Sequence, residues 1–164
     1  MRWGKAVIAV TGVAVLAVLT MVKLNDPVPF EMQEIVRNSS IFEIVSLDPK
    51  LNHPDSAHRF YRWTELGRAT VASTTTKAAL INAVYDGIAK GAYAGMKCFN
   101  PRHAIHVVSG KKTLDILVCF ECRHVRFVLG GHQIEKNIDS SFEQLFDDTL
   151  KEHKIPLAPK PSRG

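Results

Sequence analysis

The chain has 164 residues, enough for one domain with its own core, and carries 21 Lys and Arg against 16 Asp and Glu, a formal net charge of +5. Three basic residues, Arg2, Lys5 and Lys23, flank an apolar N-terminal segment, so 18 basic residues remain against 16 acidic ones elsewhere. Because these charges are interspersed and form no basic stretch, the composition argues against a nucleic-acid-binding protein.

The first 23 residues are predicted to anchor the chain in a membrane. Residues 6–22 form a run of 17 residues without a charge, and a helix of that length spans about 26 Å, close to the hydrocarbon thickness of a bilayer. Arg2 and Lys5 precede the run, so the N-terminus is expected to stay in the cytoplasm and the rest of the chain to be exported. A cleaved signal peptide would end at a small-x-small site, which the sequence after Leu16 does not offer, so an uncleaved signal anchor over 1–23 is favoured.

The rest of the chain is predicted to form one domain between two short segments. Two prolines and mixed polarity indicate a linker over 24–39, with a short helical turn over 31–37. The folded domain is expected over 40–155, and the proline-rich residues 156–164 are expected to form a flexible tail.

The domain is predicted to contain several strands and two amphipathic helices. Alternating polarity with β-branched and aromatic residues predicts strands, one with a break at Gly67, over 41–47, 60–73, 104–109, 113–129 (one bent strand or two) and 132–138. Helical spacing of apolar residues, after capping residues around Thr75 and Ser140, predicts helices over 77–91 and 142–153. Short glycine-containing turns join the late strands, so we expect an α+β fold: a two-layer domain with a mostly antiparallel sheet and both helices on one face.

Three cysteines and one histidine are the strongest candidates for a site. They are Cys98, His103, Cys119 and Cys122, in the motifs CFNPRH and CFEC. If the strands over 104–109 and 113–120 form a hairpin, the start of the first lies beside the end of the second. The two motifs would then lie together.

Three interpretations of this cluster remain open. In an oxidising compartment a disulfide is expected, and Cys98 with either Cys119 or Cys122 is the easier pair, because residues three apart in a strand point to opposite faces. A tetrahedral zinc site would use all four side chains, with a Cys-x2-Cys spacing that suits such sites. A thiol enzyme would use His103 as the base for Cys98 or Cys122. No helix is predicted after Cys122 to lower a thiol pKa, which argues against the third interpretation.

Arg102 and Glu121 lie inside the two motifs. The hairpin could bring their side chains together as a bidentate ion pair, which is favoured, or leave one of them as a ligand contact. Tyr61 and Trp63 are expected to pack on the sheet, and His106 to lie on a strand at or near the surface.

With these motifs the chain resembles a set of small bacterial exported proteins of unknown activity that carry paired CFxPRH and CFEC motifs. The resemblance rests on CFNPRH (98–103), LVCFEC (117–122) and IPLAP (155–159), within residues 60–159. It implies a bacterial, extracytoplasmic setting and no particular activity.

The sequence therefore predicts a single-pass membrane protein whose domain lies outside the cytoplasm, in the periplasm if the cell is Gram-negative. The domain is expected to bind an unknown protein or small molecule and to be stabilised at the cysteine and histidine cluster by a disulfide or by zinc. The alternative is an extracytoplasmic thiol- or zinc-dependent enzyme that uses the same cluster.

Overall fold

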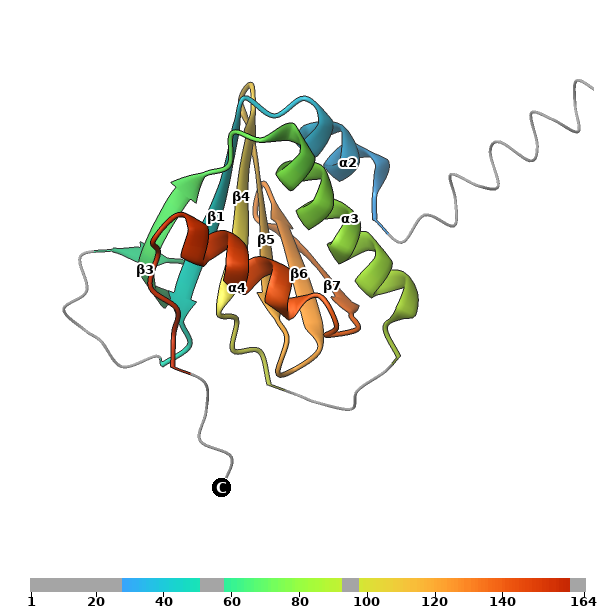
Figure 1. Cartoon of the computed structure of the whole chain (residues 1–164). Coiled ribbons are helices and arrows are strands. Elements are labelled where there is room, and N and C mark those ends of the chain that lie inside the picture. The colour runs from blue at the N-terminus through green and yellow to red at the C-terminus, as the bar shows by residue number, and fades with distance from the viewer. Residues whose placement is uncertain (1–27, 51–57, 93–97, 160–164) are drawn as a thin grey trace, which may run out of the picture.

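An antiparallel sheet of seven strands carries three helices on one face in the part of the chain that the structure describes (Figure 1). The computed structural model describes residues 28–50, 58–92 and 98–159. The strands lie in the order β2-β3-β1-β4-β5-β6-β7. Their bounds are β1 Ile41–Asp48, β2 Arg59–Phe60, β3 Trp63–Thr70, β4 His103–Ser109, β5 Lys112–Cys119, β6 His124–Leu129 and β7 His132–Asn137. The helices are α2 Phe30–Arg37, α3 Thr74–Lys90 and α4 Glu143–Glu152.

Tight turns connect the last four strands, which confirms the predicted antiparallel sheet. Gly110 turns β4 into β5 with φ 59°, and Gly130 and Gly131 turn β6 into β7 with φ 56° and 84°, backbone angles that glycine adopts without steric penalty. The stretch 113–129 forms two strands, because the chain turns through residues 120–123.

The two faces of the sheet differ in what covers them. On the helix face, side chains such as Ile105 pack with residues of α2, α3 and α4 in one large core. On the opposite face, here called the open face, a smaller cluster forms around residues such as Trp63 and Leu117. Because successive side chains of a strand alternate, strands β1, β3, β4, β5 and β6 each contribute to both clusters. The α+β, two-layer prediction is confirmed.

Helix α2 belongs to the domain, which corrects the predicted linker for residues 28–37 and raises the number of helices from two to three. The short helical turn predicted over 31–37 is this helix. Val28, Met32 and Ile35 are almost completely buried in the helix-face core. Met32 and Ile35, three residues apart, lie on one side of α2, and burial of this apolar side stabilises a helix that is too short to be stable alone. The packed domain therefore reaches back to Val28.

The segment after α4 also packs on the domain, which corrects the predicted flexible tail for residues 156–159. The Ser46 hydroxyl donates a hydrogen bond of 2.6 Å to the carbonyl oxygen of Pro156. Arg102 donates from Nη1 to the carbonyl oxygens of Ala158, at 3.2 Å, and of Pro159. Ile155, at the start of this segment, lies against Gly67 of β3. The pairing of β3 with β1 shifts register next to Gly67, between Ser46 and Leu47, which confirms the predicted break in this strand.

The helix starts differ slightly from the predicted ones. Ser73 caps α3, because its hydroxyl accepts a hydrogen bond of 3.1 Å from the Thr76 amide. Helix α4 begins at Glu143 without a side-chain cap, and the Ser141 amide is instead bound by Asp139 at 2.9 Å. The predicted serine cap at residues 140–141 is therefore corrected.

The predicted anchor lies outside the described residues. Within residues 28–50, 58–92 and 98–159, no helix is long and apolar enough to span a bilayer.

Close contact between α3 and Phe142 generates a first prediction. A Cβ atom on residue 87 would overlap the Phe142 ring, so G87A should destabilise the domain by about 1–3 kcal/mol, although alanine is the better helix former. Urea unfolding measures the change, and N82A, at an exposed position of the same helix, is the control and should be close to neutral. The penalty should shrink in an F142A background, and an equal loss in both backgrounds would contradict the overlap.

Candidate functional site

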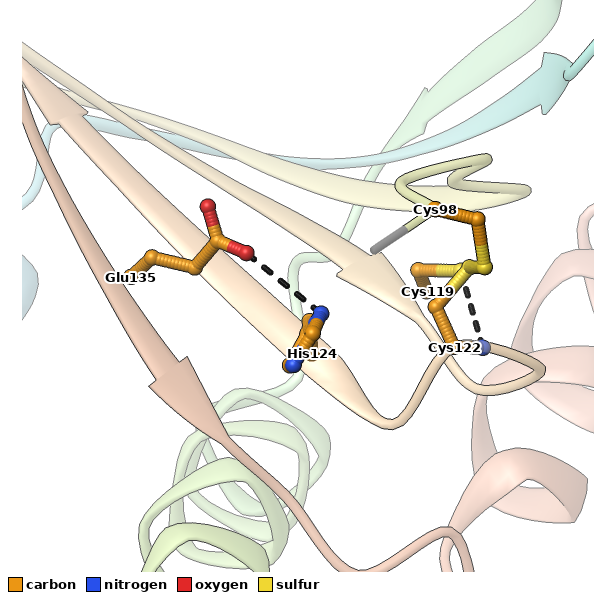
Figure 2. The surroundings of a disulfide bond; sticks show 5 residues. All are labelled: Cys98, Cys119, Cys122, His124 and Glu135. Atoms are coloured by element: carbon orange, nitrogen blue, oxygen red, sulfur yellow. Dashed lines mark hydrogen bonds and ion pairs between the residues drawn. A yellow bond between two sulfur atoms is a disulfide. The ribbon is translucent and has the colours of Figure 1, made fainter. Parts of the chain in front are cut away.

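A disulfide between Cys98 and Cys122 ties the segment before β4 to the turn between β5 and β6 (Figure 2). The two Cα atoms are 6.0 Å apart, and the bond closes a loop with a sequence separation of 24. Cys119 ends β5, and the turn after it, with Arg123 at φ 57°, returns Cys122 to the same open-face cluster. The predicted disulfide is confirmed, with Cys122 as the partner of Cys98.

Cys119 is a buried free thiol beside this disulfide. Its sulfur accepts a hydrogen bond of 3.1 Å from the backbone amide of Cys122 (Figure 2). Burial raises the pKa of the Cys119 thiol, against a smaller lowering by hydrogen bonds from the backbone at Asn100 and Cys122. A thiol with a raised pKa carries little thiolate at neutral pH, so Cys119 is a poor nucleophile.

His103 lies on the other side of the sheet from the cysteines. Its Nε2 atom is 2.8 Å from Oδ1 of Asp147 on α4, and both side chains are buried. Phe120 and Phe146 meet the imidazole edge-on, with ring centroids 5.3 and 5.8 Å away. The structure therefore does not assemble the four side chains of the proposed zinc set, and the described residues contain no group of three or more His, Cys, Asp and Glu side chains placed to hold a metal.

Arg102 and Glu121 also have different surroundings. Arg102 binds the carbonyl oxygens at the end of the chain segment after α4, and Glu121 lies exposed in the turn between β5 and β6. No ion pair joins the two in the described part of the chain, so the favoured bidentate pair between them is not present there. Arg102 instead holds residues 158 and 159 against the sheet.

A chain of hydrogen bonds on the open face connects β4, β5 and the turn before β3. Asp115 accepts a hydrogen bond of 2.6 Å from the Tyr61 hydroxyl at Oδ2, and its Oδ1 lies 2.6 Å from Nδ1 of His106. His106 and Asp115 are cross-strand partners, and Tyr61 reaches them from a turn where its φ is 56°. A non-glycine residue with such a φ needs support from its surroundings, and the bond to Asp115 provides it.

This hydrogen-bonded chain shifts two pKa values. The bond to Asp115 raises the pKa of His106, against an opposing effect of burial. Burial, with the Asp115 carboxylate next in importance, raises the pKa of the Tyr61 hydroxyl. At neutral pH Tyr61 therefore stays protonated and acts as a hydrogen-bond donor.

A pocket of about 280 Å³ opens beside this chain on the open face. Leu117 and Val128 supply apolar side chains to its lining, and Trp63, Arg62 and Arg126 supply aromatic and cationic groups. The Arg62 guanidinium lies 4.8 Å from the centre of the Trp63 ring. The pocket thus combines an apolar surface with two cations, a combination that suits ligand binding.

The disulfide is physically connected to this pocket through Phe99. The Phe99 ring meets Trp63 edge-on, with centroids 5.8 Å apart, and lies 4.0 Å from the Arg126 guanidinium. Arg126 is also paired with Glu135 at 3.1 Å, and Glu135 lies 3.4 Å from Nδ1 of His124 (Figure 2). Because Cys98 precedes Phe99, its bond to the β5–β6 turn restrains the ring that supports two residues of the pocket.

A larger groove, of about 510 Å³, lies between α2 and α3, over Phe42. Its rim carries Arg37, Thr74 and Asn82, which are exposed side chains on helix surfaces, and Lys77, whose Nζ is 5.9 Å from the Phe42 ring. Polar side chains of this kind are usual on the solvent-exposed surfaces of two packed helices. We therefore regard the open-face pocket as the better candidate site.

The residues of the pocket were not predicted from the sequence as a site. Tyr61 and Trp63 were expected to pack on the sheet. Trp63 does so, whereas Tyr61 is 48% exposed, and both line the pocket. The pairing of His106 with Asp115 was accessible from the sequence, since a turn at residues 109–112 sets these positions opposite each other. Nothing local in the sequence signals the contact of Tyr61 with Asp115.

No protein-family model, curated protein or solved structure matches this chain. The functional inference therefore rests on the side chains and their geometry.

Loss of the disulfide generates a stability prediction. C98A/C122A should lower the free energy of unfolding by about 3 kcal/mol, the contribution expected for a cross-link that closes a loop of about this length. Guanidinium unfolding measures it. C119A is the control and should lose no more than about 1 kcal/mol, since it removes one buried sulfur atom and no cross-link. Equal losses in the two variants would contradict a stabilising role of the bond.

The His106–Asp115 pair generates a pH prediction. Because folding raises the pKa of His106 above 6.5, the pair stabilises the fold fully below that pH, and this contribution is lost as the pH rises through the folded-state pKa. D115N should lower the pKa of His106 and remove this part of the pH dependence. NMR titration of the His106 imidazole measures the shift, with D148N, an exposed aspartate on α4, as the control. An unchanged His106 titration in D115N would refute the assignment.

Proposed function

We propose that this chain is a membrane-anchored extracytoplasmic domain that binds a partner through the open face of its sheet. The observation that carries the proposal is the disulfide between Cys98 and Cys122, because such bonds persist in oxidising compartments and are rare in the cytosol. The charged and apolar pattern of residues 1–23 supports export with the N-terminus retained inside. The resemblance to small bacterial exported proteins supports the same setting.

The start of the packed domain bears on how it would sit at the membrane. Val28 is 1% exposed and fixed in the core, only five residues after Lys23. A chain of that length reaches at most about 18 Å. If residues 6–22 span the bilayer, the end of the domain that carries α2 is held close to its surface. Phe30, at the start of α2, is 55% exposed and would lie at this end.

The surroundings of the cysteines favour binding over thiol chemistry. Two of the three thiols are joined to each other, and burial raises the pKa of the third, Cys119. His103, the expected base, is bound to Asp147 on the opposite face. A thiol enzyme needs a thiolate next to a base, and a zinc enzyme needs several ligands at one point. The open-face pocket, in contrast, offers the residue types of a ligand site.

Labelling of the full-length protein from native membranes tests the proposal. Unfolded without reduction, the chain should take one N-ethylmaleimide, on Cys119, and three after reduction, as intact mass would show. The same mass reports whether residues 1–23 remain attached. In spheroplasts, protease added outside should digest the domain, while a cytosolic marker protein stays intact.

The C122A variant is the matched control, since it should expose two free thiols before reduction. The proposal would be overturned by three labels on the unfolded, unreduced wild-type chain, by stoichiometric zinc, or by a domain that is protected from external protease.

A further inference from the structure

We propose that the open-face pocket binds a small organic carboxylate with a planar apolar body, and that the disulfide between Cys98 and Cys122 maintains the pocket by holding Phe99 in place. This inference deepens the proposed function, because it names the site and the class of ligand. The charges around the pocket, the residue types of its lining and the contacts of Phe99 support it.

The charges around the pocket favour a ligand with one negative charge. Among the described residues that line it, none carries a carboxylate, and two carry guanidinium groups. Arg126 is paired with Glu135, whereas Arg62 stacks on Trp63 and has no carboxylate partner in the described part of the chain. Arg62 is exposed, so its guanidinium is accessible to a ligand, and its planar fork of N–H donors matches a carboxylate.

The lining favours an apolar, flat ligand body. Leu117 and Val128 provide aliphatic contacts, and Trp63 provides aromatic surface. A volume of about 280 Å³ has room for a single ring with a short acidic group and lies at the small end for ligand sites. A purely inorganic anion would leave this apolar surface uncovered.

Phe99 makes the pocket dependent on the disulfide. Its ring contacts both Trp63 and Arg126, which lie on strands at different places in the sheet. Cys98, its neighbour, is bonded to Cys122 in the turn that leads into β6, the strand of Arg126. When this bond is broken, the segment of Phe99 loses its cross-link to the turn before β6. The contacts of the Phe99 ring with Trp63 and with Arg126 are then weakened together.

A fluorinated fragment tests the ligand class on the full-length chain in nanodiscs, with empty nanodiscs as the reference. In 19F NMR, 4-fluorobenzoate should bind with a dissociation constant of about 1 mM, as expected for a fragment of this size. The neutral isostere 4-fluorobenzamide should bind at least about tenfold more weakly, because it lacks the charge that Arg62 recognises. Inorganic phosphate at equal concentration should not displace the benzoate.

Variants test the residues. R62Q should weaken benzoate binding at least about fivefold, while R37Q, an exposed arginine on α2, should leave it unchanged. F99A and C98A/C122A should both weaken binding, with circular dichroism confirming that each variant is folded. F99A keeps the disulfide, so it remains informative if C98A/C122A does not fold.

Several outcomes would overturn the inference. Equal binding of the benzamide, displacement by phosphate, or full affinity in R62Q would overturn carboxylate recognition, and full affinity in F99A would overturn the role of Phe99. These measurements use purified protein and do not depend on where the domain resides. Their failure is therefore distinguishable from failure of the export proposal, which labelling and protease access decide in cells.

Discussion

A turn at Gly110 and Lys111 sets Ser109 opposite Lys112, and from there the pairing of β4 with β5 runs without a break to His103 opposite Val118. This register determines the content of both faces. It directs His103 to the helix layer and places His106 beside Asp115 on the open face. A slip of β4 by one residue would exchange its two faces, which would bury His106 under α4 and separate His103 from Asp147.

Polar groups on the two faces fasten different parts of the molecule to the same two strands. On the helix face, the bond between His103 and Asp147 fixes α4 over β4 within an aromatic environment. On the open face, Asp115 holds Tyr61 and with it the turn between β2 and β3. The disulfide then restrains the segment of Phe99, which packs on the open face. The central hairpin is thus the common support for the helix layer, the sheet edge and the candidate site.

The sequence predicted what depends on local pattern and missed what depends on distant contacts. Alternating polarity and turn glycines were enough to predict the antiparallel strands. The expected oxidising compartment, together with the hairpin that brings the two motifs together, was enough to favour a disulfide at Cys98. The grouping of His103 with the cysteines did not hold, because hairpin pairing brings positions together without saying to which face each side chain points. The pocket was missed because Tyr61 and Arg126 come from separate parts of the chain. The tail was misjudged because a proline-rich composition does not reveal the donors at Ser46 and Arg102.

The position of that tail also determines when folding can finish. Ser46, on the first strand of the sheet, donates to Pro156, 110 residues later in the chain. A chain that is delivered from its N-terminus leaves β1 without this partner until Pro156 has emerged. Closure of such a long loop is slow compared with hairpin formation. The domain therefore completes its packing only after Pro156 has been delivered, and a molecule halted before that residue would present an unfinished sheet to chaperones and proteases.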